Sequence, residues 1–206
     1  QEPAAKALIG FVPQDDLLIE ELTVYQNLWF TAKLCFEGMT DEYIDKRVTD
    51  VLRQLDLLAA RDLKVGSAIN KFISGGQRKR VSIAMEYISN PDLFVLDEPD
   101  SGLDGVLARD LMTRLNGIAR QGKIVIVITH SPDRVLDLFD DIMVLAKDAD
   151  KTGRLVFFGT VEEAKKFFET DKIENVVRMI NRSSEGGEGR ADELIEKFME
   201  VSHAGV

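Results

Sequence analysis

The stretch Leu93–Pro99, with the sequence LFVLDEP, decides how the chain is interpreted. Four apolar residues lead directly into two adjacent carboxylates, and a proline then ends the run. A short apolar run that stops at a turn residue is typical of a strand buried on both faces, as in parallel sheets. Because ligands of such sheets bind beyond the carboxyl ends of the strands, Asp97 and Glu98 are expected at the rim of a site. One carboxylate there suits a metal ion and the other a general base, although a strand capped by two solvated acids fits the same pattern.

The composition fits one globular domain, or one domain with a small lobe. The chain has 206 residues, of which 45% are hydrophobic and 30% charged, which is ordinary for a domain with a real core. Its net charge of −10 argues against a broad nucleic-acid surface, so no nucleic-acid partner is expected. The single cysteine, Cys35, excludes a disulfide framework and favours a reducing compartment. No apolar run approaches the roughly twenty residues of a membrane span, so membrane association is expected only through a partner.

Four further motifs surround the LFVLDEP stretch. Val12–Gln14 (VPQ) ends an early apolar run, and Ser74–Gln77 (SGGQ) opens a predicted helix. Ser101–Asp104 (SGLD) follows the two carboxylates, and His130 comes after the β-branched strand predicted at Ile124–Ile128. Three of these motifs alone also have a plain structural interpretation: a surface glutamine, a serine helix cap and a structural histidine. Their order and spacing carry more weight than any one of them.

In this order and spacing, the five motifs resemble the Q-loop, signature motif, Walker B, D-loop and H-loop of an ABC (ATP-binding cassette) transporter nucleotide-binding domain. The resemblance covers residues 7 to 169, and the runs Val12–Asp16 and Arg78–Arg80 resemble the subfamily of pigment and sterol exporters. It implies an α/β fold: a P-loop NTPase-like cassette core, mainly a parallel sheet flanked by helices, with an α-helical subdomain. The basic run Arg78–Arg80 also fits a solvated face, and Asp100 departs from the threonine or serine usual in the family.

The resemblance also implies domain boundaries. Residues 1–22 and 90–170 would form the RecA-like catalytic core, and residues 23–89 the helical subdomain that carries the signature motif. Residues 171–206 would form a C-terminal extension with a glycine-rich flexible break at Gly186–Gly189 and a terminal helix at Ala191–Val201.

The family's site roles transfer to matching positions. Glu98 is expected to polarise the attacking water, while Gln14 and His130 order the water and the γ-phosphate. Asp97, helped by Gln14, is expected to hold Mg²⁺. The residues expected to contact ATP, in part the ATP of a second cassette, are Ser74, Gly75, Gly76, Gln77 and Asp104. Glycines at a helix N-terminus suit this role, because they let backbone N–H groups approach a phosphate closely.

A P-loop, G-x-x-x-x-G-K-[ST], is expected before the Q-loop and is not found. The near match Gly117–Ile124 is rejected because Ile124 has no hydroxyl for magnesium and because its context is helix–loop–strand. The chain therefore resembles a cassette without its N-terminal part, and we expect these 206 residues alone to be inactive. In cassette domains the strand before the H-loop lies between the Walker B and P-loop strands, so one edge of Ile124–Ile128 is expected to lack a partner.

The function implied for the parent protein is ATP hydrolysis that drives transport. Its cofactors would be ATP and Mg²⁺, and its partners a transmembrane domain and a second nucleotide-binding domain in a head-to-tail dimer. The expected location is the cytoplasmic face of a membrane. Two alternatives stay open: a truncated cassette that acts as a non-hydrolysing binding or regulatory module, and a cassette ATPase of DNA repair or translation. The absence of sustained heptads between Gln14 and Ser74 weighs against the DNA-repair relatives, which carry inserted coiled coils there.

Overall fold

The computed structural model describes residues 9–67 and 72–204 of the chain. Its backbone forms two compact units that divide between Thr129 and His130. This division falls inside the stretch 90–170 expected to belong to the catalytic core, and the subdomain boundaries implied by the resemblance stay a prediction. The two units are described one after the other.

The first unit is built on a three-stranded parallel sheet. Its strands are β1 (Ile9–Val12), β2 (Leu93–Asp97) and β3 (Ile124–Ile128), in the order β1-β2-β3. The register places Ile9 beside Leu93, and Leu93 beside Ile124. The predicted parallel sheet is therefore confirmed, with the LFVLD strand at its centre.

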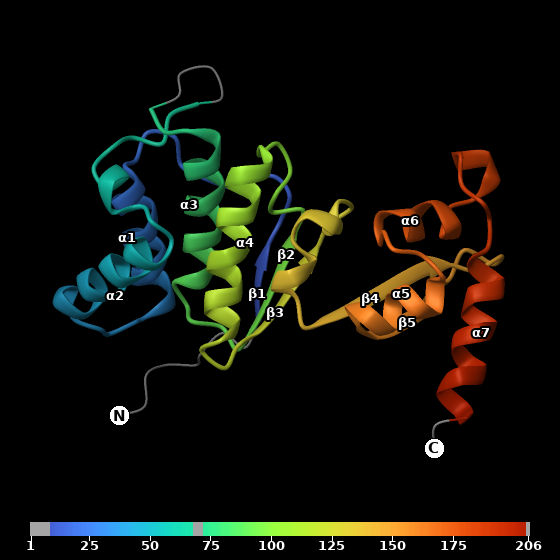
Figure 1. Cartoon of the computed structure of the whole chain (residues 1–206). Coiled ribbons are helices and arrows are strands. Elements are labelled where there is room, and N and C mark those ends of the chain that lie inside the picture. The colour runs from blue at the N-terminus through green and yellow to red at the C-terminus, as the bar shows by residue number, and fades with distance from the viewer. Residues whose placement is uncertain (1–8, 68–71, 205–206) are drawn as a thin grey trace. The chain divides into compact units, whose positions relative to one another are not determined.

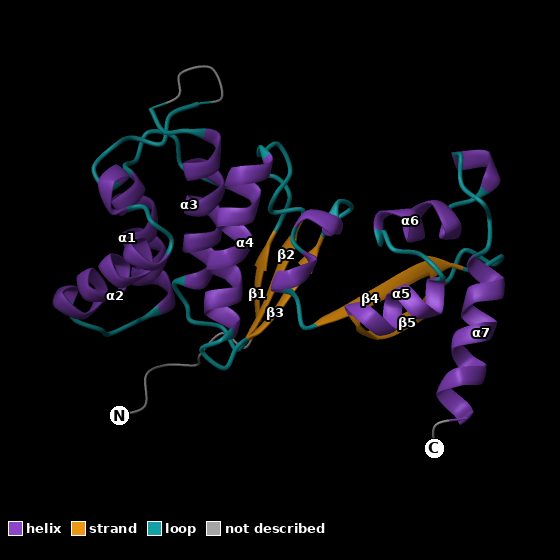
Figure 2. Cartoon of the chain, in the orientation of Figure 1, coloured by secondary structure: helices purple, strands orange, loops and turns teal. Residues whose placement is uncertain are grey.

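Two helices lie along one face of this sheet: α3 (Gly75–Tyr87) and α4 (Gly105–Ala119) (Figures 1 and 2). Phe94 and Leu96 of the central strand are buried on this face, and the Phe94 ring lies 5.8 Å from that of Tyr87. Leu93 and Val95, which point to the opposite face, are only partly buried. The expectation that this strand is buried on both faces is therefore wrong for the described residues, because the two helices cover one face only.

A helical block precedes the signature motif, as predicted. It contains α1 (Val24–Cys35), α2 (Asp41–Gln54) and a short 3₁₀ helix at Leu58–Ala60. The hydroxyls of Thr23 and Thr40 accept hydrogen bonds from backbone N–H groups three residues further on, which explains why the helices begin there.

The second unit is an antiparallel hairpin with three α-helices on its apolar side. The hairpin pairs β4 (Asp141–Lys147) with β5 (Gly153–Thr160). The helices are α5 (Val161–Phe168), α6 (Glu174–Ile180) and α7 (Ala191–Ala204), and 3₁₀ turns lie at Pro132–Arg134, Leu136–Leu138 and Ser183–Glu185. A capping box between Thr160 and Glu163 starts α5, and the terminal helix agrees with the one predicted at Ala191–Val201. The buried side chains of this core are Ala146, Val156, Phe157, Ala164, Phe168, Ile173, Val176, Ala191, Leu194 and Ile195.

Two features of the C-terminal stretch depend on contacts that local sequence patterns do not show. Helix α6 has no side-chain cap from its own N-terminus; instead, the Asp133 carboxylate accepts the backbone N–H groups of Ile173 and Glu174, at 2.8 and 3.2 Å. In the glycine-rich break, the N–H groups of Gly187 and Glu188 donate to the Arg182 and Arg178 carbonyls at 2.9 and 2.8 Å, and the flexibility of the break stays a prediction. A Cβ on Gly187 would lie 2.1 Å from the Asn181 carbonyl oxygen, so this glycine permits a close backbone approach.

Strand β3 is an edge strand among the described strands, which leads to a prediction about amide exchange. Its Ile124 N–H donates to the Asp92 carbonyl at 2.9 Å, and alternate N–H groups along a strand point to opposite sides. We therefore expect Val125 and Val127 amides to exchange faster than that of Ile126, and the strand to associate with other copies through this edge.

Hydrogen exchange with light scattering on the 206-residue chain measures both effects. A monomer whose Val125 and Val127 amides exchange as slowly as those of Phe94–Leu96 would show that the edge is covered internally, and self-association would be refuted.

Candidate functional site

The two carboxylates predicted to form the site lie at the carboxyl end of β2. Asp97 is the last residue of the strand, and both it and Glu98 are half-buried. The backbone of Glu98 has φ of 44°, and its N–H donates to the Ile128 carbonyl at 2.9 Å. A non-glycine residue with positive φ is uncommon, and such residues concentrate at functional sites. The conformation starts the turn that leads away from the strand.

The structure brings Gln14 and Glu98 together, although 84 residues separate them. The Gln14 Nε2 donates a hydrogen bond to the Glu98 Oε2 at 3.1 Å. This contact arises because β1 and β2 are adjacent and parallel, so that the residues following each strand meet at one edge. The sequence predicted both residues, and the sheet explains their proximity.

Asp100 closes the turn from the other side. Its Oδ2 accepts a hydrogen bond from the Thr129 hydroxyl at 3.2 Å, directly after β3. The loop after the carboxylate pair is thereby tied to the end of the neighbouring strand. Sequence reasoning noticed Asp100 only as a departure from the family pattern, and its role as an acceptor for Thr129 depends on strand adjacency.

The signature residues form the start of α3. The Ser74 Oγ accepts from the Gln77 N–H at 3.1 Å, and the Gln77 Oε1 accepts from the Ser74 N–H at 2.8 Å. This capping box confirms the predicted helix start. Nothing lies within 4 Å of where a Gly75 Cβ would stand, so the backbone here is open to approach. The ATP contacts of Ser74, Gly75, Gly76 and Gln77 stay predictions, which this open, 13-residue helix N-terminus suits.

Asp104 caps the next helix. Its Oδ1 accepts from the N–H groups of Val106 and Leu107, both at 2.9 Å. A Cβ at Gly76 would stand 3.5 Å from the Leu107 Cδ1, so the signature motif and the start of α4 are in contact. The predicted ATP contact of Asp104 stays a prediction.

The basic run after the signature motif is not a solvated face. Arg80 is 13% exposed and pairs with Asp110 at 3.2 Å and Asp56 at 3.5 Å, linking α3 to α4 and to the turn after α2. The pKa of the Lys79 ammonium is lowered because the group is partly buried. Nearby carboxylates, among them Asp97, raise this pKa, but their effect is smaller than that of burial.

His130 is the first residue of the second unit, and its side chain is exposed. Its role toward the γ-phosphate stays a prediction.

The donor chemistry at the end of β2 suits a shared magnesium site. Among residues 9–67 and 72–204, no three His, Cys, Asp or Glu side chains converge to hold an ion by themselves. Mg²⁺ is typically bound by one or two carboxylates together with substrate phosphates. The Asp97 carboxylate and the Gln14 amide oxygen supply oxygen ligands of this kind, so the set fits an ion that arrives with ATP.

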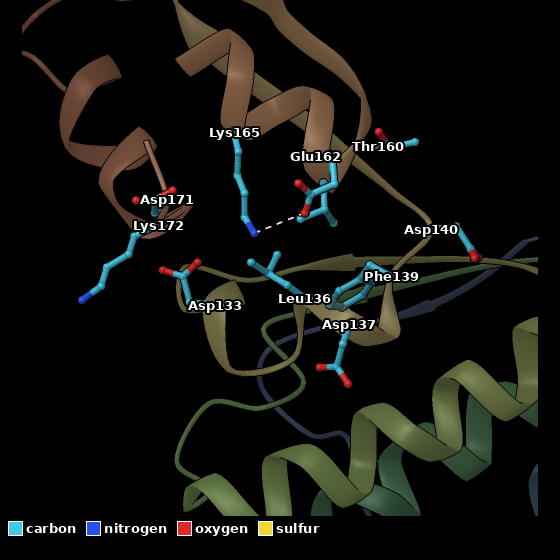
Figure 3. Close-up of a pocket in the computed structure, with 11 residues that line it drawn as sticks. Asp133, Leu136, Asp137, Phe139, Asp140, Thr160, Glu162, Lys165, Asp171 and Lys172 are labelled. Carbon is cyan, nitrogen blue, oxygen red and sulfur yellow. Dashed lines mark hydrogen bonds and ion pairs between the residues drawn. The ribbon is translucent and has the colours of Figure 1, made fainter. Parts of the chain in front are cut away.

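A separate open cleft of about 590 Å³ lies within the second unit (Figure 3). None of the predicted site residues lines it. Figure 3 shows Lys165 reaching toward Glu162, 3.4 Å away. Five carboxylates and two lysines line this cleft, a balance that opposes a phosphate chain. The charged lining residues are Asp133, Asp137, Asp140, Glu162, Asp171, Lys165 and Lys172.

The fold and the predicted site therefore define a class: an α/β ATP-binding cassette. A parallel sheet carries the carboxylate pair at its rim, a glutamine from the adjacent strand contacts the second carboxylate, and a glycine-rich helix N-terminus follows the helical block.

Comparison with known proteins supplies the family. The sequence profile described as ABC transporter matches residues 1–101. ABC transporter G family member 22 of Arabidopsis thaliana is 41% identical over 165 residues, covering 79% of this chain and 21% of the relative. The broad substrate specificity ATP-binding cassette transporter ABCG2 of Bos taurus is 39% identical over 161 residues, covering 77% of this chain and 24% of the relative. Among solved structures, cbiO1 from Clostridium perfringens, described as part of the ABC transporter complex cbiONQ, matches with a TM-score of 0.66 and 29% identity, covering 77% of this chain and 59% of that one.

The chain belongs to the ABC transporter family, as a nucleotide-binding domain of the pigment and sterol exporter-like subfamily. It spans 21% and 24% of the lengths of the two G-type relatives. Within the described residues, no helix combines the length and apolar character needed to cross a bilayer.

Proposed function

We propose that the chain is the ATP-binding and ATP-hydrolysing part of an ABC transporter. The observation that carries this proposal is the 3.1 Å hydrogen bond from Gln14 to Glu98 at the carboxyl edge of the sheet. A general base for water needs a second polar group nearby to orient that water, and the pair provides both.

In the proposed reaction, the oxygen of water forms a bond to the γ-phosphorus, and the bond from that phosphorus to the β–γ bridging oxygen breaks, releasing ADP. Glu98 accepts the proton that the water loses, and Gln14 orients the water and the Glu98 carboxylate. Asp97 would hold Mg²⁺, whose charge, when bound, balances the negative charge on the phosphates. His130 would contact the γ-phosphate. Positioning and charge stabilisation account for most phosphoryl-transfer catalysis, which suits this division of roles.

The signature helix is proposed to serve a second cassette. Its open Gly75 backbone and the positive end of its helix dipole favour an anion, which in a head-to-tail dimer would be the γ-phosphate held by the partner. Asp104, at the start of α4 and in the same corner of the fold, is proposed to lie at this dimer interface. The transmembrane domain would be the other partner and would hold the cassette at the cytoplasmic face of the membrane.

Phosphate release by the full-length protein tests this function. We expect release that requires both ATP and Mg²⁺, because the Asp97 carboxylate is itself negative and the Gln14 amide is neutral, so neither side chain can neutralise the phosphates without the ion. Tight ATP binding with no phosphate release would instead indicate the non-hydrolysing binding module, and would contradict the proposal.

A further inference from the structure

The second residue after SGG in the signature helix, Arg78, holds the loop that carries Gln14. Its Nε and Nη2 donate to the two carboxylate oxygens of Asp16, at 2.8 and 2.9 Å, in a bidentate pair. Its Nη1 donates to the Gly66 carbonyl, on the loop that leads back toward the signature motif. The Arg78 and Asp16 side chains are 18% and 26% exposed, so this pair is shielded from solvent more than an ordinary surface ion pair.

Lys79, the next residue, reaches the same loop at a second point. Its Nζ donates to the backbone carbonyl of Gln14 at 2.7 Å. Two consecutive side chains of α3 thus bind the loop, Lys79 at the Gln14 carbonyl and Arg78 at the Asp16 carboxylate. The Gln14 side chain connects these anchors to Glu98, because its amide donates to the Glu98 carboxylate at 3.1 Å.

We propose that Arg78 and Lys79 are positioning residues for catalysis: they fix the backbone of the Gln14 loop so that the Gln14 amide meets Glu98. The inference rests on the proposed hydrolysis at Glu98. It assigns the two basic side chains a role through Gln14, without contact to ATP.

The geometry of the Gln14 loop explains why it needs these two anchoring contacts. The Gln14 side chain is exposed and follows a proline that ends β1, so neither burial nor the sheet ladder holds it. A carbonyl fixed by Lys79 sets the position of the Gln14 backbone, and the Arg78–Asp16 pair fixes the loop two residues later. A displacement of about 1 Å at a catalytic group can reduce a rate about 10²-fold, so we expect loss of either anchor to have a large effect on the rate.

The anchors also lie one residue beyond the capping box of the signature motif. Ser74 is the N-cap, and Gly75 to Lys79 form about the first one and a half turns of one continuous helix. Helix α3 therefore makes both contacts. Its Ser74–Gly76 end is proposed to bind a ligand, and its Arg78 and Lys79 side chains hold the Gln14 loop. One helix thus connects the Ser74–Gly76 segment, which is proposed to face the partner's nucleotide, with Gln14, which is proposed to orient the water in the cassette's own site.

The test is a pair of substitutions in the full-length protein, Lys79→Met and Arg78→Ala, each measured alone and in a Gln14→Ala background. Met keeps the apolar stem of Lys79 but removes the donor. We expect each single variant to lower kcat about 10- to 100-fold with little change in the KM for ATP. In the Gln14→Ala background, the same substitutions should lower kcat less than about twofold further, because the group they position is already missing.

Arg80→Met is the matched control. Arg80 lies on the same helix, but its partners are Asp56 and Asp110. Both carboxylates also pair with Arg114, so each still has a positively charged partner when Arg80 is replaced. We expect this variant to keep kcat within about twofold and to leave the loop unaffected. Hydrogen exchange gives a readout that is independent of activity: amide exchange at Gln14–Leu17 should rise in Lys79→Met and Arg78→Ala but not in Arg80→Met.

The outcomes separate the two proposals. A wild-type protein that releases no phosphate refutes the proposed function, while the exchange data still decide whether Arg78 and Lys79 hold the loop. An active wild type whose Lys79→Met and Arg78→Ala variants keep normal kcat, or lose equal factors with and without Gln14, would overturn the positioning role.

Discussion

Replacement of Glu98 by glutamine is expected to lower ATP hydrolysis by the full-length protein about 10²–10⁴-fold while ATP binding is retained. Glutamine is nearly the same size as glutamate but cannot accept the proton of the attacking water. Its side-chain oxygen can still accept the hydrogen bond that Gln14 donates to Glu98 at 3.1 Å, so the local geometry should survive. The measurements are phosphate release and nucleotide binding on the same sample.

A consequence of this variant is a trapped dimer. Since ATP binds but is not consumed, two cassettes should stay associated head to tail in the presence of Mg-ATP. Glu42→Gln, on the exposed first turn of α2, is a control for the charge change alone and should behave as wild type. Retention of more than half of the wild-type hydrolysis rate in Glu98→Gln would remove Glu98 from the role of base.

Replacement of Ser74 by arginine is expected to abolish most hydrolysis while each separate monomer still binds ATP. The proposed ligand of the Ser74–Gly76 backbone is the nucleotide of the other cassette, so a bulky side chain there should block only the dimer. Comparison of ATP affinity in monomeric samples with turnover in dimeric ones separates the two steps. If monomer affinity fell as steeply as turnover, the assignment across the interface would be wrong.

Ser74 is also a helix cap, and this structural role needs its own control. Loss of a serine or threonine cap typically costs about 1 kcal/mol. Thr40→Arg removes the equivalent cap of α2, far along the chain from the signature motif, and should give a similar loss of stability without the loss of turnover. Ser74→Thr keeps a capping hydroxyl and should retain most of the activity.

Local rules explain which parts of the fold the sequence predicts well. Four helices begin one residue after a serine or threonine whose hydroxyl accepts a nearby N–H: the capping residues are Thr23, Thr40, Ser74 and Thr160. The central strand and β3 were likewise recognisable from short apolar runs. Such features depend on neighbours within a few residues, so they can be predicted directly from the amino-acid sequence.

Features that depend on distant partners were missed or misjudged. Helix α6 is capped by Asp133, some forty residues earlier in the chain, and no sequence pattern near the helix predicts this contact. Asp100 acquires its partner Thr129 only because β2 and β3 are adjacent. The run Arg78–Arg80 fits a solvated face by composition, and only the tertiary structure shows that its members contact the Gln14 loop, α4 and the turn after α2.

The candidate site divides in the same way. Asp97, Glu98 and Gln14 were predicted by motif, and parallel pairing of β1 with β2 explains why Gln14 reaches Glu98. The contacts to ATP and Mg²⁺ expected of the signature residues, Asp104 and His130 involve groups outside the chain, so they stay predictions.

The most direct measurement of the central proposal is phosphate release by four versions of the full-length protein: wild type, Gln14→Ala, Glu98→Gln and the double variant. If Gln14 acts by orienting water and the Glu98 carboxylate, its removal should slow the wild type about 10- to 100-fold but change the Glu98→Gln protein little. Equal fold losses in both backgrounds, or a Gln14→Ala protein as fast as wild type, would contradict a catalytic role for the Gln14–Glu98 pair.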